Sequence, residues 1–117
     1  MTAMRDAYNK IGADYDDVLN RLMSDDMVAR FAIKFLDDDS MPKLDAAIEA
    51  ADAKAAFIAA HTLKGVCQNL SFDNLYAPAV DVTEALRGAS TIDAAVPLMP
   101  ALREQYATTV AAIREAM

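Results

Sequence analysis

Residues 53–70, AKAAFIAAHTLKGVCQNL, decide the fold of this chain. When successive residues are advanced by about 100° around a helix, the small and apolar side chains collect on one face. These residues are Ala56, Ala59, Ala60, Leu63, Val66, Cys67 and Leu70. Because most of them are small, this face predicts a buried helix that neighbouring helices approach closely.

The opposite face of the same helix carries His61, the single histidine of the chain. We expect its side chain to point into solvent, because it falls almost opposite Leu63 on the helix. The residues expected around it on the outer side are Lys54, Phe57, Ile58, Lys64, Gly65 and Gln68. The sequence therefore predicts a surface that combines an exposed imidazole, nearby cations and two large apolar side chains.

Lys64 and Gly65 indicate what this surface does. Lys64 follows His61 by three residues, so the two side chains are neighbours on the helix. A glycine in mid-helix costs about 1 kcal/mol relative to alanine, and Gly65 removes the side chain that would crowd His61 from one turn away. A neutral imidazole nitrogen can attack a phosphoryl group, and a cation offsets the negative charge of the product. The spacing indicates an uncovered nucleophile beside a charge stabiliser.

Caps and helix breakers divide the rest of the chain into further helices. Alanine is the commonest residue and there are only 3 glycines and 4 prolines, a composition that favours helices. Asp14, Ser24 and Ser71 are expected N-caps, and Gly12 and Gly88 are expected helix ends. The expected helices cover about residues 3–11, 14–23, 24–37, 40–51, 53–70 and 71–87, with a last helix starting between 91 and 97 and ending near 115.

Four of these helices are longer than the others and predict the fold class. The fold is expected to be all-α, an antiparallel four-helix bundle with additional short N-terminal and connecting helices. The length of 117 residues fits one domain, 1–117, and no repeat or linker interrupts it. The initial Met1 and the lack of linkers favour a complete protein over an excised domain.

The composition narrows the classes of function. A net charge of -7, from 18 acidic and 11 basic residues, argues against binding nucleic acid or an anionic membrane surface. The sequence contains no nucleotide-binding motif, no signal segment and no apolar run long enough to cross a membrane. One Cys and one His cannot fill a structural zinc site, and Cys67 is expected to be a buried, reduced and inert thiol. We therefore expect a cytoplasmic protein without an ATP site.

The segment 61–72, HTLKGVCQNLSF, resembles the signature of histidine-containing phosphotransfer (HPt) domains. That signature is H-x-(apolar)-K-G, followed by small residues, an apolar residue and a glycine before the next helix. The Ala59-Ala60 pair and Leu75 also fit it. Two residues depart from the family pattern: Gln68 replaces a small residue, and Ser71 replaces the glycine. We expect Ser71 to be harmless, because it is small and can cap the next helix.

The resemblance implies a phosphocarrier of two-component phosphorelays. His61 is then the phosphorylated residue, Lys64 stabilises the phosphoryl group, and Gly65 gives the partner room. The implied partners are response-regulator receiver domains and hybrid histidine kinases, and the receiver supplies the Mg²⁺, so no cofactor is expected on this chain. We further expect a monomer, with partner contacts made by Lys54, Phe57, Ile58 and Gln68.

Other interpretations compete with this one. The chain is alternatively a helical interaction module that is never phosphorylated, or a dimeric histidine-kinase-like phosphotransferase in which paired helices present His61. Phe57 and Ile58 could instead pack under helix 40–51. For Phe57 we expect this packing as much as we expect contact with a partner. The aspartates at 14, 16 and 17 and the run at 37–39 are expected caps, surface charges and a solvated loop rather than metal ligands.

Overall fold

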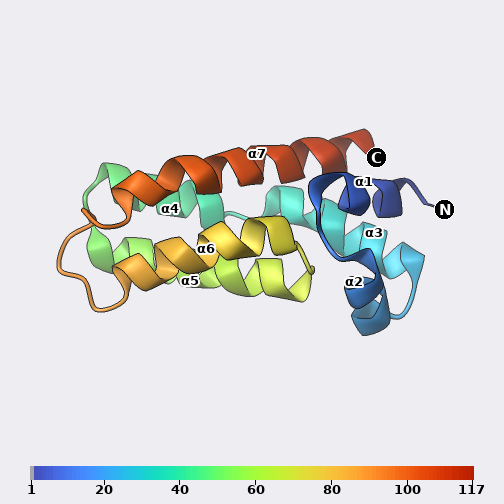
Figure 1. Cartoon of the computed structure of the whole chain (residues 1–117), viewed down its shortest axis with the longest axis horizontal. Helices are drawn as coiled ribbons and strands as arrows, with labels where there is room; N and C mark the ends of the chain where they lie inside the picture. Colours follow the sequence, from blue (N-terminus) through green and yellow to red (C-terminus); the bar gives the residue numbers. More distant parts are fainter. Residues whose placement is uncertain (1) are drawn as a thin grey trace.

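Helices account for most of residues 2–117, the part of the chain that the computed structural model describes, and no strand occurs there (Figure 1). The all-α fold class is therefore confirmed. The α-helices are α1 Ala3–Ile11, α2 Tyr15–Leu22, α3 Asp25–Lys34, α4 Ser40–Glu49, α5 Ala53–Asn69, α6 Asp73–Leu86 and α7 Met99–Glu115, and the short 3₁₀ turns are η1 Phe35–Asp37 and η2 Val96–Leu98.

Most of the predicted caps are confirmed. Asp14 Oδ1 accepts a hydrogen bond of 3.0 Å from the backbone N–H of Asp17, and Ser24 Oγ accepts one of 3.2 Å at the start of α3. Gly12 and Gly88 follow α1 and α6 in the left-handed conformation, with φ of 78° and 65°. Glycine adopts this conformation without the steric penalty of a side chain, so both helices end where the sequence indicated.

Ser71 does not cap α6, so that prediction is wrong. Its backbone is left-handed, with φ of 55°, and forms the turn between α5 and α6. Its Oγ donates a hydrogen bond of 2.6 Å to Asp17 and accepts one of 2.9 Å from Arg21, so the side chain faces α2. The N-cap position of α6 is Phe72, which makes no side-chain capping bond.

Two helix boundaries differ from the prediction because 3₁₀ turns occupy them. The helix expected over 24–37 is regular to Lys34 and continues as η1 to Asp37. The last helix, α7, begins at Met99, just after the window predicted for it, because η2 holds Pro97. Proline cannot donate a backbone hydrogen bond, so it is compatible with the first turn of a helix but not with its interior.

The bundle is antiparallel, and one of its four sides is assembled from two helices. Figure 1 shows α5, α6 and α7 lying along the long axis, with α3 and α4 following one another along the remaining side. The break between them is the aspartate run that the sequence marked as a loop. The short helix α4, expected as a connection, thus packs along α5 as part of the bundle wall. The short helices α1 and α2 lie at the end of the bundle where α5 turns into α6.

A single apolar core runs through the bundle. Its largest fully buried side chains are Tyr8, Phe72, Leu44, Leu63, Leu75, Leu86, Met99, Leu102, Ile113, Val18, Val28 and Val82. Burying one such side chain stabilises the fold by about 1.5–3 kcal/mol. Tyr8 connects the N-terminal helices to this core, since its ring lies 5.2 Å from that of Phe72 and its hydroxyl donates a 2.7 Å hydrogen bond to the Leu70 carbonyl. Within residues 2–117, no helix has both the length and the hydropathy needed to span a membrane.

Candidate functional site

Helix α5 presents the candidate site because its two faces differ as predicted. Asp52 caps its start by accepting a 3.0 Å hydrogen bond from the Ala55 N–H. Six of the seven residues predicted on the inner face are buried, and Val66 is half-buried. The inner face fixes the rotation of the helix, so the opposite face must point outward.

His61 lies exposed in the middle of the outer face. Its imidazole lies 5.8 Å from the ring of Phe57, centroid to centroid, with the two planes tilted by 43°. Among the hydrogen bonds between described residues, none involves the imidazole. Both ring nitrogens are therefore available to a reacting partner as far as the described chain is concerned.

Gly65 leaves an open space one turn after His61. A Cβ built on this glycine meets no atom of another part of the described chain within 4 Å, and its backbone is ordinary helix. Neither internal packing nor backbone conformation therefore requires glycine here, although it weakens the helix by about 1 kcal/mol relative to alanine. The described chain therefore gives no structural reason for glycine at this position.

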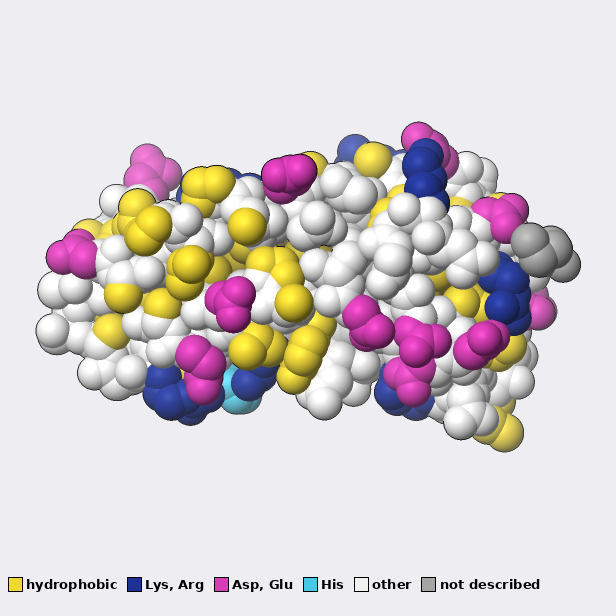
Figure 2. Space-filling view, in the orientation of Figure 1, with side chains coloured by type: hydrophobic (Ala, Val, Ile, Leu, Met, Phe, Trp, Pro, Cys, Tyr) yellow, Lys and Arg dark blue, Asp and Glu magenta, His cyan; other side chains and the backbone are white. Residues whose placement is uncertain are grey.

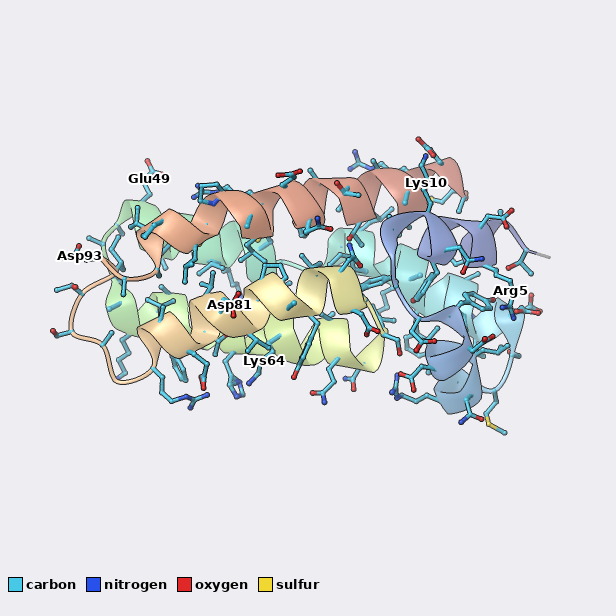
Figure 3. The ribbon with its side chains drawn as sticks, in the orientation of Figure 1. Arg5, Lys10, Glu49, Lys64, Asp81 and Asp93 are labelled. Carbon is cyan, nitrogen blue, oxygen red and sulfur yellow. The ribbon has the colours of Figure 1, made fainter. Side chains whose placement is uncertain are left out.

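Lys64, the third predicted site residue after His61 and Gly65, is half-buried and follows His61 by three residues on α5. Figure 3 shows Lys64 where α5 runs next to α6. Within residues 2–117, no carboxylate forms an ion pair with its ammonium group. Its charge is thus not neutralised by a described neighbour and is available at the site.

The four predicted partner-contact residues divide into two groups. Lys54, Ile58 and Gln68 are exposed, and Ile58 is a large apolar side chain with 57% of its surface exposed. Ile58 lies on the edge of a groove of about 490 Å³ between α4 and α5. Phe57 is half-buried against the core, and its ring lies beside the imidazole of His61 and the guanidinium of Arg87.

Arg87 is the site residue that the sequence reasoning missed. It is the C-cap of α6, and its guanidinium carbon lies 5.2 Å from the centroid of the Phe57 ring, at a cation–π distance. Figure 2 shows the histidine at the edge of the molecule with Lys and Arg side chains on both sides of it. In an antiparallel hairpin, residues at similar distances from the turn face each other, and Phe57 and Arg87 come close to that condition. That rule is the signal that could have found Arg87.

The aspartates of α2 form ion pairs outside this site, and the Cys67 thiol lies in the core. Asp16 pairs with Arg5 at 3.0 Å and Asp17 with Arg21 at 3.0 Å, which confirms the prediction of surface charges. No cluster of three potential metal ligands occurs in the described part of the chain. Cys67 is fully buried, and burial raises the pKa of its thiol to about 12, as expected for an inert side chain.

Comparison with known proteins identifies a family. A family model described as Hpt domain matches residues 35–116, which include η1, the helices α4 to α7 and all the site residues described above. The search of curated proteins found no significant match. The search of solved structures likewise found none.

Proposed function

The chain belongs to the Hpt domain family, the histidine phosphotransfer proteins of two-component phosphorelays, and on that premise we propose that His61 accepts a phosphoryl group from the phosphoaspartate of a receiver domain and relays it to another receiver. The family match covers the helices that carry and surround His61, which is the single histidine of the chain. An aspartyl phosphate is a mixed anhydride, so it can transfer its phosphoryl group to imidazole without ATP.

The observation that carries this proposal is the open space above Gly65 next to an exposed His61. A receiver must bring its phosphoaspartate to within bonding reach of the imidazole, and reacting atoms about 3–3.5 Å apart leave no room for an intervening side chain. The chain itself gives no reason for glycine at this position. Clearance for an incoming protein surface supplies that reason.

The proposed transfer is a reversible exchange at phosphorus. The unprotonated imidazole nitrogen of His61 donates its electron pair to form a P–N bond. The P–O bond to the aspartate breaks, and its electron pair stays on the carboxylate oxygen. The proton on the other ring nitrogen is then lost to solvent. The product carries about two negative charges, and the ammonium group of Lys64 stabilises them better than it stabilises the neutral ring.

The partner contributes the rest of the chemistry in this proposal. The receiver holds the Mg²⁺ and the acidic pocket, and this chain supplies His61, Lys64 and the docking surface without a cofactor or an ATP site of its own. Lys54, Phe57, Ile58 and Gln68 are the proposed partner contacts, because they surround His61 on the outer face of α5. The chain is further proposed to be monomeric and cytoplasmic, with a hybrid histidine kinase as the source of phosphate.

The test is to mix the purified chain with Mg²⁺ and receiver domains from the same genome that carry labelled phosphoaspartate. Label that moves to this chain and is stable to alkali but lost in acid supports a phosphohistidine. Sedimentation of the same sample distinguishes the proposed monomer from a dimeric kinase-like arrangement.

A pure interaction module is the second candidate. Ile58, exposed on the edge of the 490 Å³ groove, favours it, because an apolar side chain beside a groove suits the docking of a helix whether or not phosphate is transferred. A receiver that binds this chain while no acid-labile phosphate ever appears on it supports this second function and contradicts the first.

A further inference from the structure

The surroundings of His61 differ between its two sides along α5. Phe57 lies one turn before the histidine and Gly65 one turn after it, so both positions adjoin its side chain on the helix surface. Side chains of an α-helix lean toward its N-terminus. The imidazole accordingly lies beside the Phe57 ring, with 5.8 Å between the two centroids, whereas the space above Gly65 is open. The histidine is therefore walled on one side and accessible on the other.

The Phe57 ring is itself held in place. It is half-buried and packs against the apolar core. The guanidinium carbon of Arg87 lies 5.2 Å from its centroid, in a cation–π contact that joins the end of α6 to this ring. A phenylalanine has only two side-chain torsions, so a ring with these two restraints forms a fixed wall for the imidazole.

No polar group of the described chain orients the imidazole. A functional histidine is often oriented by a hydrogen bond from one ring nitrogen to a backbone carbonyl or a carboxylate. Within residues 2–117, His61 makes no such bond and belongs to no ion pair. The contact with the Phe57 ring is thus the interaction that can supply the missing orientation.

We infer that Phe57 is a positioning residue for phosphoryl transfer, whose ring restricts the imidazole of His61 to a rotamer that is open to attack from the Gly65 side. The inference rests on the proposed function of His61 and is separate from the partner contact proposed for Phe57. In a helix, χ1 near +60° is rare and the χ2 of imidazole has two broad wells, so an unrestrained ring divides among about four arrangements. Restricting it to one reactive arrangement raises the rate by at most about fourfold, because that geometry is populated more often.

The test phosphorylates the full chain with phosphoramidate, a small donor that makes no protein–protein contact. The imidazole nitrogen bonds to phosphorus, the P–N bond of the donor breaks, and its electron pair leaves with ammonia. The proton on the other ring nitrogen is lost to solvent. Phe57→Leu, which keeps an apolar side chain without the ring, should react about two- to fourfold more slowly than wild type. Phe57→Tyr, which restores the ring, should react at the wild-type rate.

The orientation of the imidazole is measured by NMR on the same proteins. His61 is the single histidine, so its couplings can be assigned without ambiguity and give the χ1 populations. Wild type should show one dominant χ1 rotamer, and Phe57→Leu should show two. A wild-type imidazole that divides between two χ1 rotamers would overturn the inference without any variant.

A phosphorylated receiver as donor separates positioning from docking. Loss of a partner contact raises the KM for the receiver, whereas loss of positioning lowers kcat at saturating receiver. Phe57→Leu should lower kcat by the same factor as it slows the reaction with phosphoramidate. The matched control is Phe31→Leu, because Phe31 is a 38% exposed phenylalanine on α3. This control should keep the wild-type rate with phosphoramidate and the wild-type χ1 populations.

A Phe57→Leu protein with the wild-type phosphoramidate rate and χ1 populations would overturn the inference, even if its KM for the receiver rises. If the wild-type chain takes phosphate from phosphoramidate but from no receiver, the relay proposal fails and not this one. Transfer from a receiver with an unchanged kcat in Phe57→Leu has the opposite meaning.

Discussion

Ser71 Oγ donates a 2.6 Å hydrogen bond to the carboxylate of Asp17, although 54 residues separate them in the sequence. Arg21 donates to both groups, at 2.9 Å to Ser71 and 3.0 Å to Asp17, and also to the carbonyl of Asn69 at 2.9 Å. This network ties α2 to the turn that ends α5. It therefore fixes the C-terminal end of the helix that carries His61.

Replacing Asp17 with Asn should lower the melting temperature and weaken its dependence on acid pH. The Ser71 hydrogen bond, followed by the Arg21 guanidinium, holds the pKa of the Asp17 carboxyl below its ordinary value. A carboxyl whose pKa is lower in the folded state stabilises the fold above its unfolded pKa of about 3.9. That contribution is lost as the pH falls through the lower folded pKa.

Thermal unfolding from pH 2 to pH 7, followed by circular dichroism, checks this prediction. The difference in melting temperature between wild type and Asp17→Asn should be present at pH 7 and shrink below pH 4. Asp16→Asn is the control, because Asp16 pairs with Arg5 outside the network. A difference between Asp17→Asn and wild type that persists unchanged at pH 2 would show that the ionised carboxylate is not responsible.

Substitutions at Gly65 should move stability and function in opposite directions. Because a Cβ meets nothing at this position, Gly65→Ala should stabilise the protein by about 0.5–1 kcal/mol. Gly65→Gln should also melt above wild type, but its side chain lies where the partner must approach. A misplacement of about 1 Å can cost on the order of a hundredfold in rate, so transfer should be severely slowed, with Gly65→Ala intermediate.

Melting temperature and the rate of phosphoryl transfer, both measured on the two variants, check the Gly65 prediction. A stabilised Gly65→Gln protein that exchanges phosphate at the wild-type rate would remove the clearance argument. A destabilised Gly65→Ala protein would show instead that the open space is needed by the fold.

Lys64→Ala should slow transfer by about ten- to hundredfold while changing the melting temperature little. The ammonium group has no ion-pair partner among the described residues, so the fold loses no charge pair when it is removed. Rapid-quench transfer from a phosphorylated receiver measures the rate. The control is Lys43→Ala, which removes a lysine of α4 that pairs with Asp39. This variant should transfer phosphate at the wild-type rate. Equal rates for both variants would make Lys64 an ordinary surface lysine.

The helices of this chain were predictable because their signals are local. Asp14, Ser24 and Gly12 act through bonds to residues a few positions away, and the sequence placed all three correctly. The exposed position of His61 followed from the periodicity of the buried residues on its own helix. Both kinds of signal depend only on neighbours within the same helix, so no tertiary information was needed.

The parts that sequence reasoning missed depend on contacts between distant segments. Ser71 was expected to cap α6, but its side chain forms hydrogen bonds with Asp17 and Arg21 of α2 instead. No local sequence pattern indicates these long-range bonds. The left-handed backbone at Ser71 explains why the family pattern has glycine there. Arg87 is absent from the motif because it reaches Phe57 across the hairpin from another helix.

The most direct test of the central claim compares wild type with His61→Gln after incubation with a phosphorylated receiver domain and Mg²⁺. His61 is exposed and the single histidine, so the variant should keep the wild-type circular dichroism spectrum and melting temperature. The measurement is the amount of acid-labile phosphate on each protein. The proposed function predicts phosphate on wild type and none on His61→Gln. Acid-labile phosphate on the variant, or its absence from a wild-type chain that binds the receiver, would contradict it.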